Sequence, residues 1–360
     1  MNKHLSLRRT GLIALVLMLL VPGVLLVLLP QNQAQFWTAN IFGRTLVYGT
    51  VALSLTFLAT YGGFVSLAQM AIAGVAGYTL AVFVQGATPS IVGGMGYGAA
   101  IGLALLAATA AGLLVGAIAV RTRDIYTLMI TLALGMGFYR FVESNIDWFN
   151  GYEGIRGVVG PELFGLPLRN PYLFYYIALA VAAALYFGVL YVVRTPFGLV
   201  MQSIRDNPRR VAALGYNVPL HRIASFGMAG FIAGCGGVLV TIYNIGISPG
   251  TIGLGPAINV LIMSVVGGLA SPIGAFVGAL VFTFFDTFAA SVYDRDRFNT
   301  LIGLVFLVIV LASPDGLTGA VERLRNRRRR SATAAAEPSE SKPAPTIQTP
   351  GLAAQPKPPA

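Results

Sequence analysis

The feature that most constrains the fold is a succession of long apolar runs separated by short, often basic, segments. The runs cover about residues 11–29, 41–61, 64–84, 94–119, 125–143, 172–193, 223–243, 257–290 and 299–312. A helix needs about 20 mostly apolar residues to span the hydrocarbon core of a bilayer. Only 10% of the residues are charged, against about 25% in soluble domains. The pattern therefore predicts an all-α integral membrane protein.

The run over 257–290 is too long for one ordinary span. Gly267, Gly268 and Pro272 interrupt it, and such a cluster breaks helices. Read as two helices, it brings the total to about ten spans, with broken or re-entrant segments. Both termini then lie inside, and the arginine cluster at 323–330 obeys the positive-inside rule. A single span would place that cluster outside.

The first apolar run could also be a secretory signal peptide, because Lys3, Arg8 and Arg9 precede it. No clear small-x-small cleavage site follows it, so we expect a retained first span. Residues 1–10 are then a cytoplasmic N-terminus and 11–320 a transmembrane domain. Residues 321–360 are basic at first and then rich in Ala, Pro, Ser and Thr, which predicts a disordered cytoplasmic tail.

The net charge of +11 does not indicate a nucleic-acid partner. Nucleic-acid binding needs a basic face on a folded domain, with interleaved aromatic residues. Here the basic residues lie in short loops and directly after the last apolar run, where they orient a membrane protein. We therefore expect the lipid bilayer as a partner and no nucleic acid.

The sequence predicts no enzyme chemistry in this chain. A P-loop needs lysine in a Gly-Lys-Ser/Thr context, and none of Lys3, Lys342 and Lys357 has it. One cysteine and two histidines offer no cluster for a metal. No nucleophile elbow or paired catalytic carboxylates stand out. We expect no catalytic residue, no metal and no cofactor, so ATP coupling would need another polypeptide.

Seven residues are candidates for a translocation pathway: Gly62, Gly63, Ser66, Gln69, Gly267, Gly268 and Asp286. The glycine tracts could mark broken helices whose exposed backbone dipoles meet a polar solute. They could equally serve close helix packing. Asp286 lies about two-thirds through the ninth predicted span. It is either a helix-packing partner or the titrating group of a proton-coupled carrier.

The inside loop over 194–222 carries a second set of candidates: Arg205, Asp206, Asn207, Arg209, Arg210, Leu214 and Gly215. Residues 209–214 are predicted to be helical, and Gly215 suits a left-handed helix C-terminus. A short exposed helix of this kind could dock a soluble partner. An ordinary basic loop that fixes topology is the alternative, and the residues alone do not decide between them.

Several motifs resemble the M-type permeases of branched-chain amino acid ABC importers. They read GGFVSLAQMAIAGVAGYTLA, RTRDIYTLMITLALG, RTPFGLVMQSIRDNPRRVAALGYNV, FGMAGFIAGCGGVL, VLIMSVVGGLASPIGAFVGA and SPDGLTG, spread over about 44–319 in the family's order. Ala68-Gln69 departs from the glycine and histidine usual in the family. Urea and short-amide importers use closely related permeases and remain the alternative.

The resemblance implies an ABC importer permease in a bacterial inner (plasma) membrane. Its partners would be a homologous H-type permease, two ATP-binding subunits that hold the ATP, and an extracytoplasmic solute-binding protein. The loop over 203–215 would be the coupling helix seated in an ATPase groove. The expected solutes are leucine, isoleucine and valine.

Overall fold

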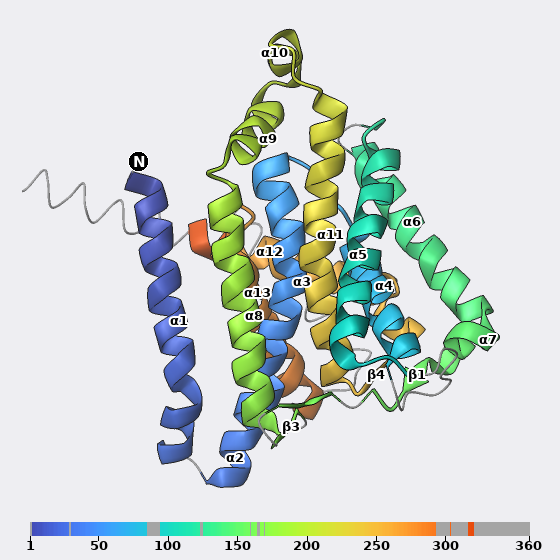
Figure 1. The fold of residues 1–360 in the computed structure, drawn as a ribbon. Coiled ribbons are helices and arrows are strands. Elements are labelled where there is room, and N and C mark those ends of the chain that lie inside the picture. Colours follow the sequence, from blue (N-terminus) through green and yellow to red (C-terminus); the bar gives the residue numbers. More distant parts are fainter. Residues whose placement is uncertain are drawn as a thin grey trace, which may run out of the picture. The chain divides into compact units, whose positions relative to one another are not determined.

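A computed structural model describes residues 2–28, 30–84, 94–122, 125–158, 160–163, 166–168, 170–292, 303 and 316–319. The chain divides into two compact units, Met1–Ala320 and Val321–Ala360, and all of the described residues belong to the first. This unit is a bundle of long helices (Figure 1). The predicted tail over 321–360 and the arginines at 323–330 lie outside the described residues.

The first half of the unit begins with α1 (Asn2–Leu28) and then a continuous helical stretch with two π-helical segments. This stretch comprises α2 (Gln31–Phe36), η1 (Trp37–Gly43), α3 (Arg44–Phe57) and η2 (Leu58–Gly62). Then follow α4 (Gln69–Phe83), α5 (Tyr97–Ala119), α6 (Ile125–Ser144), α7 (Ile146–Phe149), η3 (Gly151–Glu153), β1 (Ile155–Arg156), β2 (Glu162–Leu163) and β3 (Leu166–Pro167).

The second half contains α8 (Pro171–Val192), α9 (Pro196–Asp206), α10 (Pro208–Ala213), α11 (Val218–Tyr243), β4 (Gly246–Ile247), η4 (Pro249–Thr251), α12 (Leu254–Gly267) and α13 (Pro272–Val292). The strands form two short antiparallel pairs, β1 with β4 and β2 with β3. In β1–β4, Ile155 lies opposite Ile247 and Arg156 opposite Gly246.

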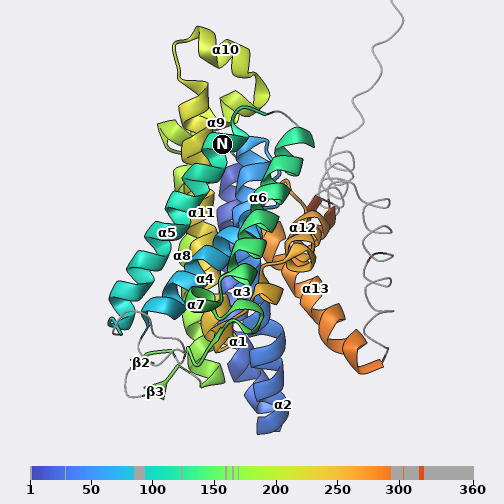
Figure 2. The same cartoon turned by 90° about the vertical axis from the view of Figure 1, so that its right-hand side faces the viewer.

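Helices α3, α4 and α11 form the centre of the bundle. Helix α11 packs against α3, α4 and α5, while α12 and α13 pack against each other and against α3. Figure 2 shows α5 on one side of this centre and α12 with α13 on the other. Helix α1 lies at the periphery against α8 (Figure 1).

Small residues allow the central helices to approach closely. A Cβ atom added at Gly230 of α11 would lie 2.7 Å from the carbonyl oxygen of Ala108 in α5. One added at Gly237 would lie 1.9 Å from the carbonyl oxygen of Ala73 in α4. Gly278 of α13 approaches Met263 of α12 in the same way. Such contacts bring backbones together in membrane helix bundles, so the Gly230-x-x-x-Gly234 and Gly274-x-x-x-Gly278 patterns serve packing here.

The bundle has two distinct ends. We call the end that carries α9 and α10 the loop end, and the end that carries β1 and β4 the strand end (Figure 1). The long helices run alternately between them, as expected for a chain that crosses a membrane repeatedly.

The predicted apolar runs correspond well to these helices. Within the described residues, six helices are long and apolar enough to cross a membrane, and three shorter apolar helices, Gly11–Leu25, Gln69–Phe83 and Pro272–Phe288, accompany them. The predicted break over 267–272 is confirmed, because α12 ends at Gly267 and α13 begins at Pro272. Of the run at 299–312 only residue 303 is described, so the tenth span stays a prediction.

Candidate functional site

Helix α9 is fixed tightly to the end of α8. The Thr195 hydroxyl oxygen accepts a hydrogen bond from the Gly198 amide at 3.5 Å, and Pro196 occupies the first helical position. Both features favour a helix start. Met201 and Ile204 are buried on one face of α9. The Gln202 amide group donates to the Val193 and Gly198 carbonyls at 3.2 and 3.0 Å, and the bond to Val193 ties α9 to the end of α8.

Helix α10 projects from the loop end (Figure 1). The Asn207 side chain accepts from the Arg210 amide at 3.1 Å and caps its start. Its end is followed by Gly215 with φ of +88°, which confirms the predicted left-handed position. Arg209 and Arg210 are exposed, and so is Leu214, whose side chain is 72% exposed. The tip therefore presents two cations and an apolar side chain to its surroundings.

The single coupling helix expected over 203–215 is instead two helices. Asn207, with φ of −155° and ψ of 92°, is extended and separates α9 from α10. The residue before a proline is disfavoured in helical conformation, and Pro208 follows directly. The break lets α10 turn away from α9 and extend beyond the bundle (Figure 1).

Arg205 connects the loop to the transmembrane bundle. Its Nε and Nη2 atoms donate to Asp206 Oδ1 at 3.0 and 2.9 Å. Its Nη1 atom donates to the carbonyl oxygen of Thr60, at the end of η2. The Thr60 hydroxyl in turn donates to the carbonyl oxygen of Leu269, in the turn between α12 and α13. Three elements far apart in sequence are thus joined at the loop end.

Of the predicted pathway residues, Gly63 lies against this same loop, whereas a Cβ atom added at Gly62 would meet the Phe64 ring at 3.2 Å. Gly63 has φ of +74°, and a Cβ atom added there would be 2.6 Å from Cγ of Arg205. The next residue, Phe64, also contacts the loop: the Arg222 guanidinium lies 4.7 Å from the centre of its ring, a cation–π distance. The structure therefore brings a pathway candidate and a docking candidate into direct contact.

Ser66 and Gln69 are buried in the bundle below this contact. Gln69 begins α4 and is 1% exposed. Its Oε1 atom accepts from the Ser54 hydroxyl of α3 at 3.0 Å. Its Nε2 atom has no hydrogen-bond partner among the described residues. A buried N–H without a partner is costly, and a polar solute or a water molecule could satisfy it.

Gly267 and Gly268 lie at the α12–α13 turn. A Cβ atom at Gly267 would be 1.7 Å from the Gly274 carbonyl oxygen. Gly268 has φ of +107°, which favours glycine. The Gly267 carbonyl accepts from the Thr318 hydroxyl at 2.7 Å. These glycines are required by close packing, and the turn that they form is the one contacted by Thr60.

Asp286 lies apart from the other candidates, near the strand end. Its Oδ2 atom is 2.5 Å from Nη1 of Arg44, at the start of α3. The Arg44 guanidinium also lies 5.6 Å from the centre of the Tyr48 ring. The geometry is that of an ion pair holding α13 to α3, the helix-packing alternative stated above.

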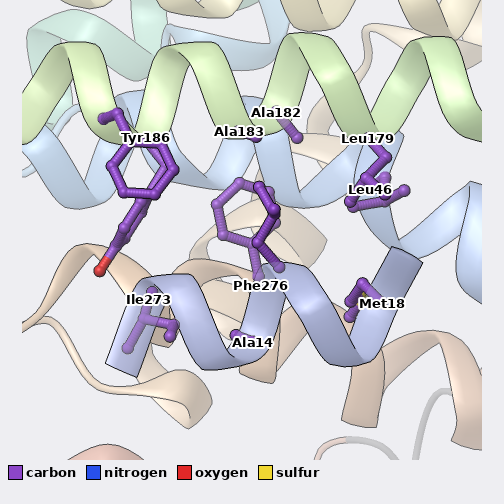
Figure 3. Close-up of a pocket in the computed structure, with 12 residues that line it drawn as sticks. Ala14, Met18, Leu46, Leu179, Ala182, Ala183, Tyr186, Ile273 and Phe276 are labelled. Atoms are coloured by element: carbon purple, nitrogen blue, oxygen red, sulfur yellow. The ribbon is translucent and has the colours of Figure 1, made fainter. Parts of the chain in front are cut away.

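An apolar cavity of about 70 Å³ lies between α1, α3, α8 and α13 (Figure 3). Leu46, Leu179 and Phe276 line it, and the ring of Tyr186 closes one end. The lining carries no charged side chain, so the cavity is unsuited to a zwitterionic solute. Elsewhere in the described part of the chain, no group of three His, Cys, Asp or Glu residues could hold a metal ion.

Comparisons with known proteins agree with the helical membrane architecture. The family model for "Branched-chain amino acid transport system / permease component" matches residues 37–311. The high-affinity branched-chain amino acid transport permease LivM of Escherichia coli K12 is 22% identical over 304 residues, covering 78% of this chain and 69% of that protein. The probable LivH of Methanocaldococcus jannaschii is 24% identical over 314 residues, covering 78% and 90%.

A nucleoside ABC transporter permease, NupC of Lactococcus lactis, is 29% identical over 186 residues, covering 49% of this chain and 56% of that protein. No solved structure matches the chain. The family match spans about three quarters of the sequence. This multi-pass membrane protein therefore belongs to the family of branched-chain amino acid transport system permease components.

Proposed function

We propose that this chain is the transmembrane permease subunit of an ATP-driven importer for branched-chain amino acids in a bacterial inner membrane. A second, homologous permease, two ATPase subunits and an extracytoplasmic solute-binding protein would complete the importer. The observation that carries the proposal is the projecting α9–α10 loop, which Arg205 ties to the end of η2. A permease driven by separate ATPase subunits needs an element that projects toward them and is bonded to the transmembrane bundle.

The loop geometry suggests how ATP-driven motion would reach the bundle. Closure of the ATPases would displace α10, which the Asn207 break lets protrude from the bundle. Helix α9 would transmit the displacement through Arg205 to Thr60, and Thr60 would pass it to the α12–α13 turn at Leu269. The two helix groups would then rock relative to one another, as in alternating access.

The choice of solute rests on the relatives. Two of them, 22% and 24% identical, are named as branched-chain amino acid permeases and align over most of the chain. Nucleoside import is a second candidate, because the nucleoside permease is 29% identical over a shorter stretch. Urea or a short amide remains a third solute class. The solute-binding protein would do most of the selecting.

Uptake of labelled leucine by cells with and without this gene tests the proposal. We expect the deletion to abolish an uptake that valine inhibits and that urea and uridine do not. If the deletion leaves leucine uptake unchanged and abolishes uptake of uridine or urea, the proposed solute is wrong, whereas the assignment as an importer permease stands.

Coupling through the loop is tested with the purified complex. Arg209→Glu and Gly215→Val should lower solute-stimulated ATPase activity several-fold while membrane insertion stays normal, because both alter the projecting tip. Arg121→Ala, which removes an exposed arginine of the α5–α6 connection, serves as the matched control. Full activity in both loop variants would remove the docking assignment.

If the chain were a proton-coupled carrier, solute uptake would depend on pH and not on the ATPase subunits. Asp286→Asn would then abolish pH-dependent uptake, and uptake would survive loss of the ATPases. We expect uptake by the Asp286→Asn variant to remain dependent on ATP, because Asp286 is held in an ion pair with Arg44.

A further inference from the structure

A depression of about 370 Å³ lies at the strand end, between the β1 segment and the connection from α11 to α12. It is remote in sequence from the α9–α10 loop and holds none of the candidates discussed above. The residues that matter here are Glu153, Arg156, Asn244, Ile245, Ser248 and Thr251. Together they offer a carboxylate, a guanidinium, an amide and two hydroxyls in one place.

The β1–β4 pair creates the open space in front of Arg156. Directly opposed residues of an antiparallel pair share one face of the ladder. Ile155 and Ile247 oppose each other and are buried, so Arg156 and its opposite, Gly246, lie on the other face. Gly246 has no side chain to fill the space. A Cβ atom there would also lie 2.6 Å from the Ile155 carbonyl oxygen, so glycine is required.

The backbone around the depression is held in an unusual conformation. Ile245 has φ of +55°, which is rare for a β-branched residue. Its carbonyl oxygen accepts hydrogen bonds from the amides of Gly157 at 3.0 Å and Val158 at 3.3 Å. On the other wall, the Asn150 amide group donates to the Gly154 carbonyl at 2.9 Å, across the turn that carries Glu153. Strain maintained by such bonds is typical of binding sites.

The two charges of the depression are available to a ligand. Within the described part of the chain, neither Glu153 nor Arg156 has an ion-pair partner. Arg44, Arg140 and Arg205 each have a carboxylate partner. A free α-amino acid carries one carboxylate and one ammonium group, which complement a guanidinium and a carboxylate. The Ile245 side chain, 38% exposed, adds an apolar surface for a branched side chain.

We infer that this depression is a docking site for the zwitterionic group of an amino acid, with Arg156 binding the carboxylate and Glu153 the ammonium. The inference rests on the proposed function, in which the strand end faces the side of solute entry. The solute would occupy the depression after its release from the solute-binding protein and before it enters the helix bundle.

Equilibrium binding of labelled leucine to the purified importer complex, without the solute-binding protein, tests the inference. Arg156→Gln and Glu153→Gln should each weaken leucine binding at least tenfold. Two leucine analogues that each lack one charge, isopentylamine and 4-methylpentanoate, should compete at least tenfold more weakly than leucine. Asp147→Asn removes an exposed carboxylate of α7 outside the depression and should leave leucine binding unchanged.

The possible outcomes distinguish a failure of the docking-site inference from a failure of the proposed import function. If the wild-type importer takes up leucine and both variants bind it normally, the docking site is overturned and the proposed function stands. If the variants alter only the stimulation of ATPase activity by the solute-binding protein, the charges contact that protein and the inference is again overturned. If the wild-type importer takes up uridine and not leucine, the proposed branched-chain solute is wrong, and the docking site that rests on it is overturned with it.

Discussion

Gly63 has two separate reasons to be glycine. Its φ of +74° lies in the left-handed region, where a residue with a side chain loses about 1–2 kcal/mol. A Cβ atom would also meet Cγ of Arg205 at 2.6 Å. The first reason is a property of the backbone, whereas the second depends on the residue at position 205, so a double-mutant cycle separates them.

We predict that Gly63→Ala lowers the free energy of unfolding by about 2–3 kcal/mol in the wild-type background, since strain and overpacking add. In the Arg205→Ala background the loss should fall to about 1–2 kcal/mol, because only the backbone strain remains. Chemical denaturation of the detergent-solubilised protein measures both losses. Equal losses in the two backgrounds would show that the Arg205 contact carries no energy.

The conformation of a single residue could be predicted from the sequence only where neighbouring residues in the chain determine it. The left-handed Gly215 could be anticipated because glycine ends a short helical pattern, and its φ of +88° confirms it. The bond from Arg205 to Thr60 could not, because nothing near either residue indicates the other. The same holds for Arg156 and Gly246, which are brought together by strand pairing across several helices.

At the scale of elements, α1 shows how a helix with an internal proline is held in place. Pro22 has no N–H, so the carbonyl oxygen of Met18, four residues earlier, loses its helical donor. The hydroxyl of Tyr175 in α8 donates to this carbonyl at 2.6 Å. One hydrogen bond therefore satisfies the carbonyl and also anchors the peripheral helix to the bundle.

We predict that Tyr175→Phe destabilises the protein by about 1–2 kcal/mol, because it leaves the partly buried Met18 carbonyl without a donor. In a Pro22→Ala background the same change should cost less than about 0.5 kcal/mol, since the new backbone N–H of residue 22 supplies the missing hydrogen bond. Thermal unfolding in detergent, followed by circular dichroism, compares the four proteins. A similar cost in both backgrounds would contradict this role for Tyr175.

Most helices were predictable as elements because an apolar run of membrane length has few alternatives. Helix α9 was missed, although Thr195-Pro196 is a helix-start signal and buried residues recur at Gly198, Met201 and Ile204. The charged residues around it favoured the interpretation as a loop. The π-helical segments Trp37–Gly43 and Leu58–Gly62 have no comparable sequence signal.

At the scale of the whole transmembrane unit, function requires the two ends to face opposite compartments. Under the proposed function, the α9–α10 loop would meet ATPases in the cytoplasm, and the depression at Arg156 would face the incoming solute. Exposed arginines are more numerous in the connections at the loop end, which carry Arg121, Arg194, Arg209 and Arg210, than toward the strand end, which carries Arg140 and Arg156. Because basic loops are retained in the cytoplasm, the charge distribution supports this orientation.

Labelling of single cysteines tests the orientation directly. The chain contains one cysteine, Cys235, so Cys235→Ala gives a cysteine-free parent. Leu214→Cys and Tyr152→Cys place thiols at side chains that are 72% and 77% exposed, one at each end. In intact cells a membrane-impermeant maleimide should label Tyr152→Cys alone, and permeabilised cells should show both. The reverse pattern would place α10 on the side without ATP, so it would overturn the coupling role of the loop and the entry role of the depression together.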